Sequence, residues 1–403
     1  MKIINDPVFG FISIPRGLLY DIVSHPAFHR LSRISQLGLS NVVYPGAQHT
    51  RFQHSMGAFH LMGLAVQSLI KKGQFIFDSE AEAVRAAILL HDIGHGPFSH
   101  VLEHTLISGV SHEEVSLVVM ERMNEEFRGQ LSLAIKIFKN EYPKRFLHQL
   151  ISSQLDVDRL DYLRRDSFYT GVTEGNIGSS RIIEMLDVVD DHLVVQKKGI
   201  YSIENYLVAR RLMYWQVYLH KTAVAAEQMM INALLRAKQL ASQGVELFAS
   251  PALRYFLYND VDRDMFFGNP DSLQHYLQLD DHDIWGALKA WCTHPDKILS
   301  VLCSNFIDRR IFKVEVSETP FDPQYVADKL QQIAAHFGIS VDEAQHFTSL
   351  LELGKDMYSL DDDKIEILQS DGTMRDVTDT SDMLNISTLS RKVKKHYFCY
   401  QRI

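Results

Sequence analysis

The residues of this chain best suited to chemistry are histidines and carboxylates that recur between residues 54 and 166. His91 and Asp92 are adjacent, and Gly94 follows them at the expected end of a helix, where the backbone opens and a ligand can approach. An imidazole nitrogen and a carboxylate oxygen suit a divalent metal ion, and open coordination positions on that ion would hold water for hydrolysis. A single His-Asp pair is nevertheless far more often an exposed or hydrogen-bonded pair than a metal site. The metal hypothesis therefore depends on the motifs that accompany the pair.

The pair lies in the motif LLHDIGHGPFSH (residues 89–100), and the other motifs are TRFQHS (50–55), His112-Glu113 and LDVDRLDYLRRD (155–166). Asp158, Tyr162 and Asp166 are spaced by four residues, so a helix would place all three on one stripe. A solvated charged face is the alternative interpretation of residues 155–166 taken in isolation. Four such motifs in one chain favour a site over a charged surface.

In this order, the motifs resemble those of the HD-domain phosphohydrolases, and within that family those of the deoxynucleoside triphosphate (dNTP) triphosphohydrolases. The resemblance covers roughly residues 1–315. It implies a divalent metal ion (Fe, Mn, Zn, Ni or Mg) whose protein ligands are His54, His91, Asp92 and Asp158. It also implies catalytic roles for His95, His100, His112 and Glu113, the last orienting His112 as an adjacent carboxylate.

The resemblance further implies two sets of substrate contacts. The residues that match phosphate-contacting positions are Arg51, Arg159, Tyr162 and Arg210. In the sugar pocket, Gln36 and Asp166 would bind the 3′-hydroxyl, Leu37 would lie beside the sugar, and Tyr218 would pack against its C2′ edge. Burying an unpaired 2′-hydroxyl at such an edge costs about 1–3 kcal/mol, so a preference for deoxyribose is expected. Without the resemblance, the spacing of Arg210, Tyr214 and Tyr218 by four residues is more typical of core packing.

The implied reaction is hydrolysis at the α-phosphorus of a dNTP, which releases the deoxynucleoside and triphosphate. One alternative is an HD-type nucleotidase or phosphodiesterase acting on another phosphoester, and a second is a nucleotide-sensing oligomer with little catalysis. The complete ligand set favours an enzyme, and the arginines favour a triphosphate tail. The resemblance also implies a homo-oligomer, a dimer or tetramer, with an activating nucleotide as a possible partner. The basic run over residues 391–395 would suit an anionic site at an interface, although a solvated surface is the commoner role of such a run.

The elements that must position these residues are mainly helical. Apolar periodicity predicts helices over His54–Ile70, over Ser152–Arg165 and over Ile203–Leu240, the last with one interruption. Two further helices are predicted to begin at capping boxes. The Ser79/Glu82 box begins a helix that runs to His91, and the Ser111/Glu114 box begins another. Strand patterns predict an N-terminal hairpin (Lys2–Ile4 and Gly10–Ile14), an inserted hairpin within Asp187–Tyr201 outside the core, and strands at Arg310–Val316 and Lys364–Leu368 separated by a helix over Pro323–Ala335. We therefore expect a mainly α fold, with an HD-domain core and helical extension over residues 1–305 and a small mixed α/β region over residues 306–403.

Composition limits the classes of function. The chain has 403 residues, of which 46% are hydrophobic, as in ordinary globular proteins. Its 41 Lys and Arg against 50 Asp and Glu give a net charge of −9, so nucleic acid is an unfavoured partner and any polyanion must be held by local positive charge. Three cysteines are too few for a disulfide framework and fit a reducing, cytoplasmic location. No stretch reaches the roughly 20 apolar residues of a membrane span, so no membrane partner is expected.

Overall fold

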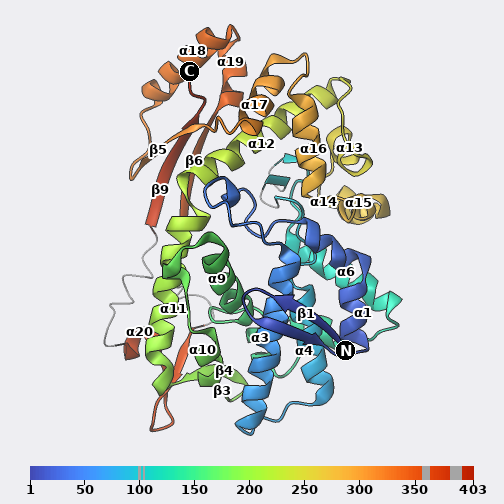
Figure 1. Ribbon diagram of the computed structural model, residues 1–403, viewed down its shortest axis with the longest axis vertical. Coiled ribbons are helices and arrows are strands. Elements are labelled where there is room, and N and C mark those ends of the chain that lie inside the picture. Colours follow the sequence, from blue (N-terminus) through green and yellow to red (C-terminus); the bar gives the residue numbers. More distant parts are fainter. Residues whose placement is uncertain (99–100, 103–104, 356–363, 382–392) are drawn as a thin grey trace.

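The computed structural model describes residues 1–98, 101–102, 105–355, 364–381 and 393–403 (Figure 1). The fold is mainly α, as the sequence predicts. The helices up to residue 307 are α1 (Leu18–Ser24), α2 (Pro26–His29), α3 (Arg51–Lys71), α4 (Asp78–Leu90), α6 (His112–Glu126), α7 (Ser132–Phe138), α8 (Arg145–Gln149), α9 (Val157–Thr170), α10 (Ser179–Met185), α11 (Ile200–Met213), α12 (Lys221–Ser242), α13 (Pro251–Tyr258), α14 (Arg263–Gly268), α15 (Pro270–Tyr276), α16 (Asp281–Trp291) and α17 (Lys297–Ile307). Among the described residues, no helix combines the length and apolar character needed to cross a membrane.

The remaining elements are strands and short C-terminal helices. They are β1 (Lys2–Asp6), β2 (Gly10–Ile14), β3 (Leu186–Val189), β4 (His192–Gln196), β5 (Lys313–Ser317), α18 (Pro323–Phe337), α19 (Val341–Ala344), β6 (Thr348–Lys355), β7 (Glu366–Leu368), β8 (Met374–Asp376), α20 (Val377–Thr380) and β9 (Val393–Tyr400). β1 and β2 form the predicted N-terminal hairpin. The strands form three sheets, with the orders β1-β2, β3-β4-β7-β8 and β5-β9-β6.

Helix α3 lies at the centre of the fold and packs against α4 and α9. Its buried residues extend around most of its circumference, so it is a core helix with little solvent-facing surface. Gly57 allows the close approach of α9: a Cβ atom at this position would lie 1.9 Å from Asp161 Oδ1 and 2.1 Å from Arg165 Nη2. The absent side chain therefore makes room for two charged groups between the helices.

Two predicted helix starts are wrong. Helix α4 begins at Asp78, and Glu80 rather than Glu82 reaches back, accepting a hydrogen bond from the Phe77 amide at 2.8 Å. Glu80 is favoured because it is buried and also accepts from the Lys144 ammonium at 2.7 Å. Helix α9 begins at Val157 rather than Ser152, because Asp156 caps it by accepting from the Arg159 amide at 2.7 Å.

Other local predictions are confirmed. The Ser111/Glu114 capping box opens α6, with each side chain accepting a hydrogen bond from the other residue's amide at 3.2 Å. The predicted long helix after residue 200 consists of α11 and α12, and its one interruption is a π-helical turn over Tyr214–Tyr218. Strands β5 and β7 and helix α18 lie where the C-terminal pattern predicts them.

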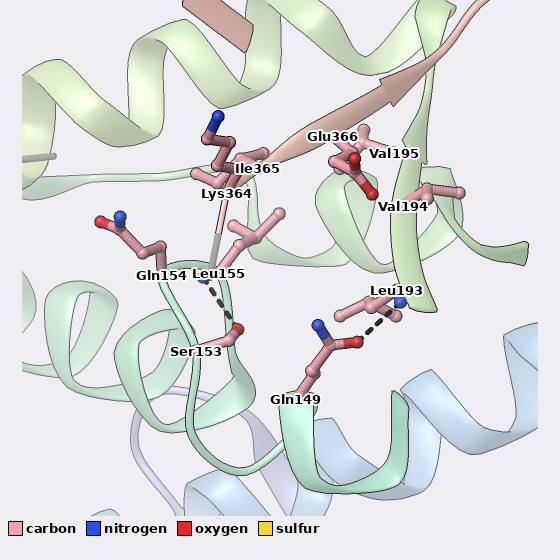
Figure 2. Close-up of a pocket in the computed structure, with 10 residues that line it drawn as sticks. All are labelled: Gln149, Ser153, Gln154, Leu155, Leu193, Val194, Val195, Lys364, Ile365 and Glu366. Atoms are coloured by element: carbon pink, nitrogen blue, oxygen red, sulfur yellow. Dashed lines mark hydrogen bonds between the residues drawn. The ribbon is translucent and has the colours of Figure 1, made fainter. Parts of the chain in front are cut away.

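The inserted hairpin β3–β4 is also confirmed, but its expected place outside the core is wrong. Val194 and Val195 are each 1% exposed, and β7 pairs with β4 in parallel, with Val195 opposite Ile367. A small cavity of about 20 Å³ remains between this strand pair and the loop before α9, and Figure 2 shows the residues that line it. The C-terminal strand therefore lies beside the segment from which α9 begins.

The C-terminal region contributes to two separate sheets. β5, β6 and β9 form one sheet beside α12 and α18, whereas β7 and β8 extend the β3–β4 hairpin. Figure 1 shows these two sheets near opposite ends of the molecule. Buried residues from both, such as Ile367 and Phe398, belong to the same hydrophobic cluster as the helical core.

Candidate metal centre and active site

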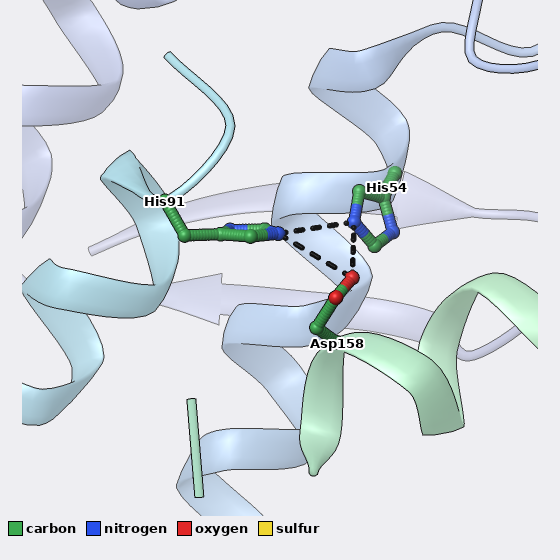
Figure 3. Close-up of side chains that lie close together, drawn as sticks. All are labelled: His54, His91 and Asp158. Carbon is green, nitrogen blue, oxygen red and sulfur yellow. Dashed lines mark hydrogen bonds and ion pairs between the residues drawn. The ribbon is translucent and has the colours of Figure 1, made fainter. Parts of the chain in front are cut away.

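Three elements bring His54, His91 and Asp158 together (Figure 3). His54 comes from α3, His91 directly follows α4, and Asp158 lies in the first turn of α9. His54 Nε2 lies 3.3 Å from His91 Nε2 and 3.0 Å from Asp158 Oδ1, and His91 Nε2 lies 3.4 Å from the same oxygen. The candidate ligand atoms of the three residues are all within 4.8 Å of one another.

Hydrogen bonds behind the imidazoles direct both Nε2 atoms toward this group. The His54 Nδ1–H donates to Asp161 Oδ2 at 2.7 Å, and the His91 Nδ1–H donates to the Ile88 carbonyl at 2.6 Å. A ring that donates from Nδ1 presents the Nε2 lone pair, which is the usual arrangement behind a metal-binding histidine. The arrangement fits a ligand set for a cation.

Asp161 is held in turn by a buried ionic network. Arg165 donates to both of its oxygens, from Nε at 2.9 Å and from Nη2 at 3.0 Å. The third guanidinium nitrogen of Arg165 donates to Asp6 Oδ2 at 2.8 Å, at the turn of the N-terminal hairpin. The hairpin therefore helps to fix the orientation of His54 through Arg165 and Asp161.

Asp92 completes the predicted set of four ligands. Its Oδ1 lies 3.5 Å from His91 Nε2, and its Oδ2 lies 3.7 Å from His54 Nε2. Asp92 Oδ2 also accepts from Arg51 Nη1 at 2.6 Å, which joins the metal group to the first of the predicted phosphate-binding residues.

The electrostatics of the group suit a cation. Burial alone would lower the pKa of His54, but hydrogen bonds to Asp158 and Asp161 outweigh it and raise this pKa to about 10. Burial would raise the pKa of Asp158, and its hydrogen bonds to His54 and His91 outweigh that effect and lower it. The carboxylates thus attract positive charge strongly to the Nε2 atoms. The two imidazoles and the Asp158 carboxylate lie together, with Asp92 beside them, and such ligands fit a divalent ion such as Fe, Mn, Zn, Ni or Mg.

The predicted catalytic histidines are only partly placed. The rings of His95 and His112 are 3.9 Å apart between centroids, and His95 Nε2 lies 3.5 Å from Asp92 Oδ1. Burial, with the nearby charge of Arg51, lowers the pKa of His95 well below its usual value and disfavours the protonated ring. Glu113 is exposed on α6, and His100 lies outside the described residues.

Three arginines of the predicted phosphate site carry buried N–H groups without partners in the described structure. These groups are Arg51 Nε, Arg159 Nε, and Arg210 Nε and Nη1. Burial raises the pKa of Tyr162, and the charges of Arg159 and Arg210 oppose that rise, so both guanidinium groups lie near this hydroxyl. Buried guanidinium donors are rarely left unpaired, and their unused N–H groups are suited to phosphate oxygens.

Of the other predicted sugar-binding residues, Tyr218 contacts Asp166 directly. Asp166 Oδ2 accepts from the Tyr218 hydroxyl at 2.8 Å, and the Tyr218 ring is 6.1 Å from that of Tyr162. Gln36 has a buried Oε1 atom that finds no partner in the described part of the chain, and Leu37 is half-buried. Tyr218 lies in the π-helical turn, a feature that occurs frequently at functional sites.

Sequence reasoning missed His49, Asp161 and Arg165. His49 donates from Nε2 to Asp166 Oδ1 at 2.7 Å, and both side chains are buried. The spacing of Asp158, Asp161 and Arg165 as i, i+3 and i+7 was the available signal for the second and third residues, since it places them on one helix face. No comparable local pattern indicated His49.

Two regions of the chain match known domain families. Residues 51–166 match the HD domain, and residues 177–249 match the HD associated region. The protein YwfO of Bacillus subtilis is 31% identical over 98% of this chain and 92% of its own length. The crystal structure of a phosphohydrolase from Bacteroides thetaiotaomicron is 68% identical, with a TM-score of 0.98 over 100% of both chains. The chain belongs to the HD-domain phosphohydrolase family.

This HD-domain phosphohydrolase is also similar to deoxynucleoside triphosphate triphosphohydrolases. The human enzyme SAMHD1 is 29% identical over 65% of this chain and 48% of its own length. The SAMHD1 homolog of Dictyostelium discoideum is 30% identical over 59% of this chain and 50% of its own length. The chain thus matches about half the length of these two relatives.

Proposed function

We propose that this HD-domain phosphohydrolase hydrolyses dNTPs to deoxynucleoside and triphosphate in a metal-dependent reaction. The observation that carries the proposal is the set of buried guanidinium N–H groups of Arg51, Arg159 and Arg210 that have no partner among the described residues. Arg51 also donates to Asp92, so this cationic group adjoins the metal centre directly. A triphosphate tail carries about four negative charges, and three arginines suit it better than a single phosphate.

In this proposal His54, His91, Asp92 and Asp158 are the protein ligands of a divalent ion. When bound, such an ion supplies a nucleophile at neutral pH and offsets charge that develops on the phosphoryl oxygens. Arg51, Arg159 and Arg210 bind the polyphosphate, and Tyr162 adds a hydroxyl beside the last two. Asp161 and Arg165 keep the His54 ring in the orientation that presents Nε2.

Proton transfer to the leaving 5′-oxygen is assigned to His112 or His100. His95 suits this role less well, because burial and the nearby charge of Arg51 lower its pKa and so disfavour the protonated form that a proton donor needs. The proposed part of Glu113 is to tune His112 from the adjacent position on α6. A group that protonates a leaving oxygen contributes about 10²–10⁴-fold to the rate of such reactions.

Sugar selection is assigned to the pocket around Asp166. Gln36 and Asp166 would bind the 3′-hydroxyl, while Leu37 and Tyr218 would lie along the sugar. The Tyr218 hydroxyl is engaged by Asp166, which holds the ring in place. A ring fixed in this way can exclude a 2′-hydroxyl, because the cost of leaving that group unpaired is not relieved by movement of the ring.

The test is product analysis with the purified chain. The protein is stripped of metal, reloaded separately with Fe, Mn, Zn, Ni or Mg, and incubated with each dNTP and NTP, with nucleoside monophosphates and with cyclic nucleotides. The proposal predicts deoxynucleoside and intact triphosphate from dNTPs alone. Release of phosphate from monophosphates, or opening of cyclic nucleotides, would instead support the nucleotidase or phosphodiesterase alternative. Binding of dNTPs without turnover in any metal-loaded form would support a sensor.

We further propose a cytoplasmic homo-oligomer, a dimer or tetramer, that an activating nucleotide assembles. The basic run contributes little support: Lys394 pairs with Glu352, Lys395 lies 4.1 Å above the Trp215 ring, and residues 391–392 lie outside the described residues. Light scattering with and without dGTP, together with rates in dNTP mixtures, tests the proposal. A monomer with hyperbolic kinetics and no cross-activation would contradict it and leave the hydrolase proposal intact.

A further inference from the structure

His49 lies directly behind Asp166, in the loop that leads into α3. Its side chain has no exposed surface, and its Nε2–H donates to Asp166 Oδ1 at 2.7 Å. The ring stacks on Tyr169, with 4.4 Å between ring centroids and an angle of 16° between planes. A buried ring that is stacked on one side and hydrogen-bonded at its edge has few alternative orientations.

The main chain of His49 contacts a second part of the proposed sugar pocket. The Gln36 amide donates to the His49 carbonyl at 3.0 Å, next to an isolated bridge between Ser35 and Thr50. The Ser35 amide donates to Asp281 Oδ2 at 2.9 Å, which holds the far side of the same segment. His49 is therefore bonded to Asp166 through its ring and to Gln36 through its backbone.

We propose that His49 is a positioning residue for recognition of the sugar 3′-hydroxyl. The inference rests on the proposed function, which assigns Asp166 and Gln36 to this hydroxyl. His49 fixes Oδ1 of Asp166, and the Tyr218 hydroxyl fixes Oδ2 at 2.8 Å. Each carboxylate oxygen can accept a second hydrogen bond, so the carboxylate stays oriented while it retains the capacity to bind a hydroxyl.

The role predicts a specific defect. Without the His49 donor, Asp166 keeps one of its two fixed hydrogen bonds and its carboxylate can turn about the bond to Tyr218. The 3′-hydroxyl would then meet an acceptor in several orientations, whereas an analogue that lacks this hydroxyl would be unaffected. A residue that only fills space would change the turnover of both substrates alike.

The experiment compares a dNTP with its 2′,3′-dideoxy analogue as substrates of the full metal-loaded chain. In His49→Gln the amide nitrogen can take the place of Nε2, whereas in His49→Asn it lies nearer the place of Nδ1 and does not reach Asp166. We expect the wild-type preference for the dNTP in kcat/KM to persist in H49Q. We expect it to fall by about 5- to 10-fold in H49N, the effect of one hydrogen bond, mainly through KM of the dNTP.

The matched control is Tyr169→Phe, which keeps the ring stacked on His49 and removes only the hydroxyl that accepts from Gln53 at 3.0 Å. This control should keep the wild-type preference. An unchanged preference in H49N, or an equal loss toward both substrates, would overturn the inference while dNTP hydrolysis by the wild type stands. Failure of the proposed function is separately visible, because the wild type itself would then release no triphosphate, and the inference would fall with it.

Discussion

Gly57 is the position where one added methyl group should damage both the fold and the metal centre. A Cβ atom there would lie 1.9 Å from Asp161 Oδ1, 2.1 Å from Arg165 Nη2 and 2.8 Å from Asp161 Cγ. Van der Waals contact requires more than 3 Å, so Gly57→Ala must push the carboxylate and the guanidinium away from α3 by about 1 Å. Asp161 would then move relative to His54 Nδ1, to which it is bonded at 2.7 Å.

The expected change in the free energy of unfolding combines two destabilising effects and one stabilising effect. Overpacking of a close-packed interior costs about 1–3 kcal/mol. Weakening a buried charged hydrogen bond adds about 1.5–3 kcal/mol, while replacing a helical glycine with alanine returns about 1 kcal/mol. We therefore expect Gly57→Ala to lower the free energy of unfolding by about 2–5 kcal/mol. We also expect weaker metal binding, because the His54 ring loses its fixed orientation.

The assay is urea unfolding followed by circular dichroism, together with metal content after dialysis against limiting metal. The control is Gly63→Ala on the same helix, where the nearest atom to an added Cβ is Arg85 Nε at 3.7 Å, an ordinary contact distance. This control should be neutral or slightly stabilising. If Gly57→Ala unfolds at the same urea concentration as Gly63→Ala and retains the same metal content, the argument from close approach is refuted.

Three further predictions concern the metal, the sugar and a buried ion pair. His91→Ala or Asp158→Ala should abolish bound metal and hydrolysis while the helical circular-dichroism signal persists; full activity after metal removal would contradict the metal mechanism. Tyr218→Ala should lower the ratio of dNTP to NTP turnover in competition assays, and an unchanged ratio would remove this ring from sugar selection. Glu80→Gln should destabilise the fold by about 2 kcal/mol at pH 7. Burial would raise the pKa of the Glu80 carboxyl, but hydrogen bonds from Lys144, Tyr142 and the Phe77 amide outweigh burial and lower this pKa. A carboxyl whose pKa is lower in the folded state stabilises the protein fully above its unfolded pKa of about 4.3, and this stabilisation is lost as the pH falls. The difference in free energy of unfolding between Glu80→Gln and wild type should therefore shrink when urea unfolding is repeated toward pH 3. A constant difference would contradict the assignment.

Features that depend on near neighbours in the chain were predictable from the sequence. The Ser111/Glu114 capping box, the hairpins and the interruption before α12 follow from local spacing, and each is present. The predictions of helix starts were wrong where a contact with a residue distant in the sequence determines which of two candidate residues caps the helix. Glu80 prevails over Glu82 because Lys144 and Tyr142 lie beside it, and local spacing contains no record of those partners.

The candidate site also contains residues that local motifs indicate and residues that only tertiary contacts reveal. His54, His91, Asp92 and Asp158 stand in recognisable motifs, and the structure brings them together, while their roles as ligands stay a prediction. His49 could not be found, because it lies in a loop and its significance depends on Asp166, which lies far along the chain on α9. The pairing of β4 with β7 was equally hidden, since neither strand alone indicates its partner.

The parallel pairing of Val195 with Ile367 has a consequence for synthesis on the ribosome. The β3–β4 hairpin leaves the ribosome long before β7, and at about 5–20 residues per second the chain between them takes about 10–30 s to synthesise. During that interval the apolar edge of β4 lacks its final neighbour, and an uncovered strand edge is a template for pairing with other chains. The nascent protein is therefore most prone to association, and most in need of a chaperone, in the interval before residue 367 emerges.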